Sequence, residues 1–110
     1  MFKLLSILSK PANMSTEKFN HYWQYTHGEM AKQLPGLVRY VQNHISSHIR
    51  PSKQSHQVNG FVELWFESRT AMEVAFTSDI GKQLIQDETV FIDDVDAYCV
   101  DEHVIYDNEL

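Results

Sequence analysis

FNHYWQYTHGEMAKQLPGL, residues 19–37, is the stretch of the sequence that decides the fold. The side chains of one face recur in it at the spacing of an α-helix. These side chains are Phe19, Tyr22, Trp23, Thr26, His27, Met30 and Leu34. Ser15 precedes the run as an N-cap, and Pro35-Gly36 follows it as a stop signal. The sequence therefore predicts a long helix over roughly residues 15–33.

Strand-like segments lie on both sides of this helix. Residues 2–9 are short and apolar, and residues 37–45 and 60–66 also have strand character, with the polar loop 46–57 between them. Helical spacing returns in residues 70–77 and 78–88, and a last strand is expected through Val95, Ala97, Cys99 and Val104. The order β-α-β-β-α-β predicts an α+β, ferredoxin-like fold, with a four-stranded antiparallel sheet and both helices on one face.

The other face of such a sheet would carry exposed apolar side chains. We therefore expect it to pack on a second copy of the chain, which gives a homodimer through the sheet face. The chain has 110 residues, of which 43% are hydrophobic, so we expect one domain over residues 1–110. A domain of this size buries a limited share of its surface, which also favours a partner subunit.

Charge and cysteine content narrow the class of protein. The formal net charge of -6 argues against nucleic acid and against anionic membranes as partners. Cys99 is the single cysteine, so an internal disulfide is impossible. The apolar start of the chain is too short to span a membrane and lacks a secretion-signal pattern. We expect a cytoplasmic protein.

His27 is the first candidate for chemistry. It lies on the apolar stripe of the predicted helix, one turn after Trp23, so it should point at the sheet. Imidazole titrates near neutral pH and can act as an acid or a base. The alternative is a core histidine that a carbonyl or carboxylate satisfies.

Glu63 and Asn43 are polar residues in otherwise apolar strands. A carboxylate between Phe61 and Trp65 is costly unless it is paired or hydrated, so Glu63 could orient His27 if both face the helices. Otherwise Glu63 faces outward or pairs with Arg39 across strands. Asn43 could bind an oxygen of a ligand, or it could be a solvent-facing residue of an edge strand.

Acids and aromatic residues complete the predicted site. Asp87 and Glu88 lie at a helix end where they oppose the helix dipole, which indicates either a role or simple solvation. Tyr22, Trp23, Trp65 and Phe91 could form the wall of an apolar pocket or belong to the core. Cys99 has the pattern of a small buried strand residue. Metal-site spacings and nucleotide-binding motifs are missing from the sequence, so we expect neither a metal nor an organic cofactor.

Several segments, in this order, resemble the EthD-like family. They are Phe19 to Tyr40 with its Tyr22-Trp23, His27-Gly28-Glu29 and Leu34-Pro35-Gly36-Leu37 motifs, then Asn59 to Phe66, Asp87 to Asp93, and Glu102-His103. The resemblance implies a dimeric α+β barrel with a pocket between each sheet and its helices. Similar small barrels include a methylmuconolactone isomerase, polyketide cyclases, decarboxylases and cofactor-free monooxygenases. In isomerase-like relatives a histidine matching His27 works in the pocket, whereas their reactive cysteine would fall near Leu64 and is missing here.

These observations predict a cofactor-free enzyme that acts on a small, oxygenated, partly apolar metabolite. His27 would move a proton next to a carbonyl or hydroxyl, and Glu63 or Asp87 would orient it. Asn43 would bind a substrate oxygen. The side chains expected to exclude water are Tyr22, Trp65 and Phe91. The alternatives are a binding or accessory protein that holds a hydrophobic metabolite, and a closed core in a module that only oligomerises.

Overall fold

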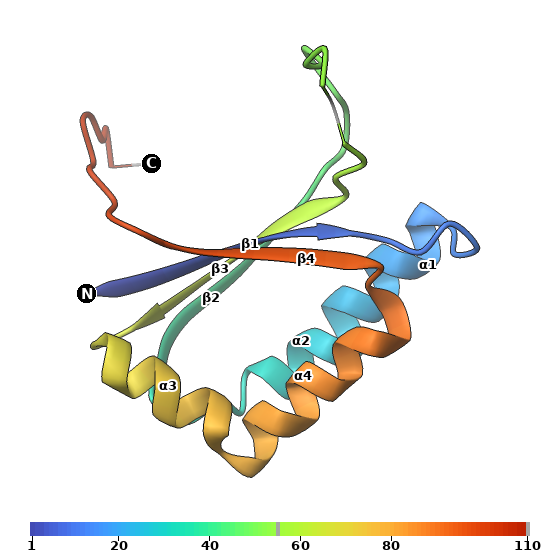
Figure 1. Ribbon diagram of the computed structural model, residues 1–110. Helices are drawn as coiled ribbons and strands as arrows, with labels where there is room; N and C mark the ends of the chain where they lie inside the picture. The colour runs from blue at the N-terminus through green and yellow to red at the C-terminus, as the bar shows by residue number, and fades with distance from the viewer. Residues whose placement is uncertain (55, 110) are drawn as a thin grey trace.

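A four-stranded antiparallel sheet with helices on one side forms the protein (Figure 1). The computed structural model describes residues 1–54 and 56–109, so position 55 of the predicted loop lies outside the described residues. The elements are β1 (Phe2–Ser9), α1 (Thr16–His21), η1 (Tyr22–His27), α2 (Gly28–Ala31), β2 (Leu37–His44), β3 (Gly60–Phe66), α3 (Arg69–Thr77), α4 (Asp79–Phe91) and β4 (Asp94–Val100). The strand order is β2-β3-β1-β4, which confirms the ferredoxin-like fold.

The first helical region runs through α1, η1 and α2 without leaving helical backbone geometry. Ser15 caps it as predicted, because its hydroxyl accepts a hydrogen bond of 3.1 Å from the Lys18 N–H. One feature was not expected: η1 is a π-helix, in which hydrogen bonds run from residue i to i+5. The Gly28 N–H accordingly donates to the Trp23 carbonyl. The region ends before Gly36, whose φ of +74° favours glycine.

Strand β3 shows which side chains face the helices. Its burial alternates strictly, and Val62, Leu64 and Phe66 are buried beneath the helices. The residues between them, including Glu63 and Trp65, lie on the opposite face, which we call the open face. The register of the neighbouring strands extends this face through Leu5, Ile7, Arg39, Val41 and Asn43.

The centre of the core joins the first helical region to the sheet. Trp23 is 1% exposed and lies directly over Gly60, the first residue of β3. A Cβ atom added at Gly60 would lie 2.4 Å from Cζ3 of Trp23 and 2.8 Å from the Asn43 carbonyl oxygen. The absence of a side chain at this position therefore lets the indole ring rest on the strand.

The Gly60→Ala variant is expected to be less stable by about 1–3 kcal/mol, the usual cost of overpacking a core. Its added methyl group meets a rigid ring and a backbone carbonyl, and neither can move without disturbing the sheet. Urea unfolding of both proteins measures the difference. Gly36→Ala is the comparison variant. It adds a Cβ at a residue with positive φ, where no atom lies within 4 Å, so it measures backbone strain without overpacking. An unchanged unfolding midpoint for Gly60→Ala would show that Trp23 can shift freely.

The end of the chain differs from prediction in two ways. Strand β4 ends at Val100, so Val104 lies beyond it in an exposed, irregular segment. Cys99 is exposed, and its expected burial is therefore wrong. The reason is that β4 is an edge strand, and all but its last residue are exposed although their sequence alternates. Within residues 1–54 and 56–109, none of the helices has the length and apolar character needed to cross a membrane.

Candidate functional site

A cavity of about 230 Å³ lies between the helices and the sheet. Its walls are mainly apolar, with a few polar side chains among them. The lining residues are Leu4, Ser6, Leu8, Trp23, His27, Tyr40, Val62, Leu64, Phe76, Leu84, Ile85, Glu88, Ile92, Val95 and Ala97. An apolar enclosure with a small number of polar groups is the usual form of a small-molecule site. The predicted pocket next to His27 is thus present in the structure.

His27 forms an ion-pair-like contact with Asp87 at the edge of this cavity. The His27 Nδ1 lies 2.8 Å from Asp87 Oδ2, and the Tyr22 hydroxyl donates to Asp87 Oδ1 at 2.6 Å. The His27 and Asp87 side chains are only 9% and 11% exposed. Because a carboxylate can only accept, Nδ1 carries the hydrogen and Nε2 is left as the basic nitrogen of a neutral ring.

The π-helical turn explains why one carboxylate can reach both Tyr22 and His27. These residues are five apart, and in an α-helix five residues would turn about 500°, which places the two side chains roughly 140° apart. The wider turn of η1 closes after five residues instead, so both side chains face Asp87 on α4. Helical periodicity of 3.6 residues places Tyr22 and His27 at opposite edges of the predicted stripe, so it does not predict that they share one carboxylate.

Burial and the negative charge of Asp87 shift the pKa of His27 in opposite directions. Removal from water disfavours the imidazolium and lowers the pKa of His27 below its ordinary value of 6.5, while Asp87 partly offsets the shift. Phe91 packs against the ring, with centroids 4.8 Å apart, and adds to its burial. The hydrogen bond to Asp87 raises the pKa of Tyr22 to about 12. The site therefore holds a neutral, basic histidine at neutral pH.

The Asp87→Asn variant is expected to return the pKa of Tyr22 from about 12 toward 10. The amide keeps the size of the side chain but removes the negative charge that disfavours the phenolate. The pKa of His27 should fall further, because Asp87 raises it in the wild type. NMR titration of the two labelled rings measures both shifts. Asp79→Asn on the same helix is the matched control, and a Tyr22 pKa unchanged by Asp87→Asn would contradict the assigned hydrogen bond.

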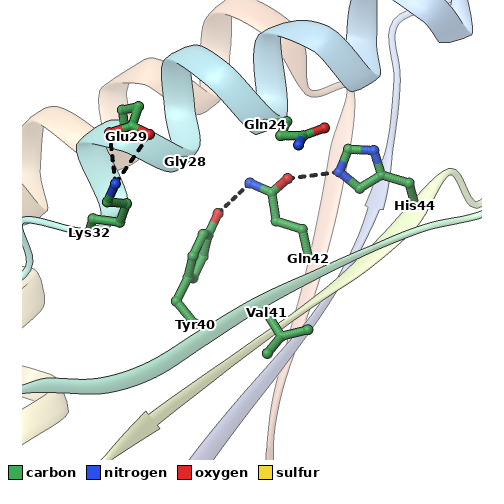
Figure 2. A pocket seen from close by; sticks show the side chains of 8 residues that line it. All are labelled: Gln24, Gly28, Glu29, Lys32, Tyr40, Val41, Gln42 and His44. Atoms are coloured by element: carbon green, nitrogen blue, oxygen red, sulfur yellow. Dashed lines mark hydrogen bonds and ion pairs between the residues drawn. The ribbon is translucent and has the colours of Figure 1, made fainter.

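A second chain of polar contacts runs along β2, through Tyr40, Gln42 and His44 (Figure 2). The Gln42 Nε2 donates to the Tyr40 hydroxyl at 2.7 Å and to the Trp23 carbonyl at 2.9 Å. The Gln42 Oε1 lies 2.7 Å from Nε2 of His44, whose ring stacks on Trp23 with centroids 4.4 Å apart. Tyr40 lines the cavity, so this chain connects it with the surface groove in Figure 2.

Tyr40 and Glu88 are two polar residues of the cavity that the sequence does not identify as parts of the site. Tyr40 lies on the same face of β2 as Gln42 and lines the cavity, but the sequence analysis gives it no role. Glu88 was treated with Asp87 as one acidic pair, yet it lines the cavity, where burial raises its pKa. The signal for Tyr40 was available, since a polar aromatic residue on the helix-facing side of a strand must find a partner.

Three predicted site residues lie on the open face, away from His27. Glu63 forms an ion pair of 2.6 Å with Lys3 and accepts a hydrogen bond of 2.8 Å from Asn43. Trp65 lies under the cations of Lys3 and Arg39. Glu63 therefore faces outward, the alternative to pairing with His27, and its ion pair is with Lys3 rather than Arg39. Asp87, the other acid predicted to orient His27, is the one in contact with it. The strand pattern could not settle this, because a shift of one residue exchanges the two faces.

Metal ligation finds no support in the arrangement of side chains. Among the residues that the structure describes, no group of three or more His, Cys, Asp or Glu side chains is placed to hold a metal ion.

Known proteins share both sequence and architecture with this chain. A 4-carboxymethyl-4-methylbutenolide mutase of Pseudomonas reinekei is 28% identical over 109 residues, which cover 94% of this chain and all of that protein. An EthD family protein of Bacillus halodurans superposes with a TM-score of 0.77 at 18% identity, covering 94% and 100% of the two chains. A dimeric ferredoxin-like protein of Bacteroides fragilis superposes with a TM-score of 0.68 at 6% identity, covering 92% and 95%.

The family model extends over most of the elements that build the cavity. The EthD domain model matches residues 11–95, which include the first helical region, β2, β3, α3 and α4. His27 and Asp87, which come from opposite ends of this range, both lie within it. The chain belongs to the EthD family.

Proposed function

We propose that the protein is a cofactor-independent isomerase that moves a proton on a small unsaturated lactone or a related carbonyl compound. The observation that carries the proposal is the contact between His27 and Asp87 at an apolar cavity. It holds the imidazole neutral, with Nδ1 donating and Nε2 basic. A general base needs this combination of fixed tautomer and pKa near or below neutral pH.

The proton transfer starts at carbon next to the carbonyl of the substrate. Nε2 of His27 takes the proton, and the electron pair of the broken C–H bond moves into the carbonyl to form an enolate. Asp87 stabilises the imidazolium that results. The imidazolium Nε2–H, which can exchange with solvent, then gives a proton to a different carbon of the conjugated system, which shifts the double bond and restores neutral His27.

Tyr40 is suited to hold the oxygen on which negative charge develops. Its hydroxyl accepts from Gln42, so its own hydrogen is left to donate. Burial raises the pKa of Tyr40 and keeps it a phenol at neutral pH. A donor aimed at a developing oxyanion in a cavity that excludes water is a strong source of transition-state stabilisation.

The substrate class follows from the size and lining of the cavity. A volume of about 230 Å³ is below the roughly 300–1,000 Å³ of sites for drug-sized ligands, so a compact compound fits best. Aliphatic walls favour a ring with few charges. The relative from Pseudomonas reinekei is a butenolide mutase, which supports an unsaturated lactone in particular.

We also propose that the whole chain acts as one domain in a homodimer through the open face. Leu5, Ile7, Val41 and Trp65 gather there around the Lys3–Glu63 ion pair. The structural relative from Bacteroides fragilis is described as dimeric. Sedimentation equilibrium should give twice the mass of one chain, and Ile7→Asp should reduce it. A single-chain mass at micromolar concentration would contradict this part of the proposal.

Hydrogen exchange tests the chemistry directly. The protein is incubated with a set of butenolides in D₂O, and ¹H NMR follows loss of the proton next to the carbonyl and any migration of the double bond. Enzyme-dependent exchange is expected for at least one compound. Saturable binding without exchange would favour the second candidate, a carrier of small hydrophobic metabolites, which the predominantly aliphatic lining also suits.

A further inference from the structure

The side chain of Gln42 contacts three residues, of which Tyr40 and His44 lie on its own strand β2 and Trp23 lies on η1. Its Nε2 donates to the Trp23 carbonyl and to the Tyr40 hydroxyl, and its Oε1 contacts His44. Figure 2 shows the side chain reaching from β2 toward the helix, between Tyr40 and His44. Trp23 is on η1, so the amide bridges the edge strand to the π-helical turn.

The orientation of the amide is fixed by its partners. A carbonyl oxygen can only accept, so the atom that faces the Trp23 carbonyl must be the nitrogen. The oxygen therefore faces His44, whose Nε2 must carry a hydrogen. Because Nε2 of Gln42 uses both of its hydrogens, a side chain without two donors at this position cannot reproduce the contacts.

The Trp23 carbonyl is a defining atom of the π-helical turn. In an α-helix it would accept from the N–H of residue 27, four positions on, but here it accepts from Gly28, five positions on. Gln42 gives this carbonyl a second donor from outside the helix. The π-helical form is rare in helices. The second hydrogen bond to the Trp23 carbonyl therefore helps to stabilise this turn in its π-helical form.

Gly28 makes room for this contact. A Cβ atom added at Gly28 would lie 3.0 Å from Nε2 of Gln42 and 3.2 Å from the Trp23 carbonyl oxygen. Both distances are shorter than ordinary van der Waals contacts, so the amide would have to shift by a few tenths of an ångström. The missing side chain of Gly28 therefore leaves the space in which the Gln42 amide reaches the Trp23 carbonyl.

We propose that Gln42 is a positioning residue, which holds the π-helical turn and thereby sets Tyr22 and His27 together on Asp87. The same amide fixes the Tyr40 hydroxyl as an acceptor, which leaves its hydrogen for a ligand. The proposal rests on the proposed function, because it gives a task to a residue behind the same site. Its test needs no substrate.

The test compares three variants in one groove, with Gln42 on the strand and Gly28 and Gln24 on the facing helix. Gln42→Glu keeps the shape of the side chain but replaces its donors with a carboxylate, which only accepts at neutral pH. Gly28→Ala disturbs the same contact by volume, and alanine favours helix more than glycine does. Gln24→Glu is the matched control. Gln24 lies on the helix across the groove, and its substitution makes the same change of charge (Figure 2).

NMR of the histidine and tyrosine rings supplies the measurement. In Gln42→Glu and Gly28→Ala, the His27 ring is expected to lose its single Nδ1–H tautomer, and the pKa of Tyr22 should fall from about 12 toward 10. The Gly28 amide in Gln42→Glu should exchange with solvent about 2- to 10-fold faster, the range for loss of one hydrogen bond. Gln24→Glu should match the wild type.

The outcomes separate this proposal from the proposed function. A folded Gln42→Glu protein with the wild-type His27 tautomer and Tyr22 pKa would overturn the positioning role. If that variant does not fold, Gly28→Ala decides by the same two readouts. Altered ring signals together with no lactone exchange in the wild type would keep the positioning role and reject the isomerase.

Discussion

The His27→Ala variant is expected to catalyse proton exchange on butenolides about 10²–10⁴-fold more slowly in kcat/KM than the wild type, the usual contribution of a general base. The variant removes the only imidazole that lines the described cavity and leaves Asp87 without its partner. His21→Ala is the matched control, because His21 is an exposed histidine on the same helical region. Equal turnover by His27→Ala and the wild type, with both folded, would exclude the assigned base.

The pH dependence of kcat/KM in the wild type should also report His27 as the base. A base acts in its deprotonated form, and burial lowers the pKa of His27 below 6.5. The acid limb of kcat/KM should therefore fall at a pH below 6.5, with a plateau above it. The free energy of unfolding should also fall as the pH falls below 6.5. The reason is that His27 binds a proton more readily in the unfolded chain than in the folded one.

The Phe91→Ala variant is expected to lose about 3–5 kcal/mol of stability, the usual cost of removing a buried aromatic ring. Phe91 is 0% exposed and packs on Phe19, Tyr22 and His27, with ring centroids 4.8 to 5.6 Å apart. Such a loss is a large part of the total stability of a small domain. Urea unfolding followed by tryptophan fluorescence measures it.

Phe91→Leu separates packing from the polar site. Leucine restores most of the apolar volume, so the loss of stability should be markedly smaller than for alanine. Water that enters beside His27 in either variant would weaken the effect of burial, and the pKa of His27 should rise toward 6.5. Equal stability of Phe91→Ala and the wild type would show that the core closes over the missing ring.

The fold was predictable because periodicity and turn residues agree along the whole chain. The stripe from Phe19 to Leu34 fixed the first helical region, and Pro35-Gly36 fixed its end. The facing of β3 was not predictable, since both of its faces carry large side chains and Glu63 fits either. The burial of Val62, Leu64 and Phe66 beneath the helices shows that this carboxylate is on the open face.

The site was predictable at His27 and only half predictable at its partner. Asp87 opposes the dipole of α4, and this small cost indicates either a role or simple solvation; the structure places Asp87 in contact with His27 and Tyr22. Tyr22 was expected to exclude water rather than to donate to an acid. The difference comes from the π-helical turn, because a helix with 3.6 residues per turn places Tyr22 and His27 at opposite edges of the predicted stripe, too far apart to share one carboxylate.

The π-helical turn also has a consequence for how this chain is compared with its relatives. It holds one residue more than an α-helix needs to close the same turn, so in the sequence it is equivalent to a single-residue insertion within residues 22–27. A gapless alignment with a relative whose helix lacks the turn would shift one half of the helix by a position. Either Tyr22 or His27 would then be matched to an unrelated residue. Alignments of this family that allow one gap there will identify which members keep both partners of the acid.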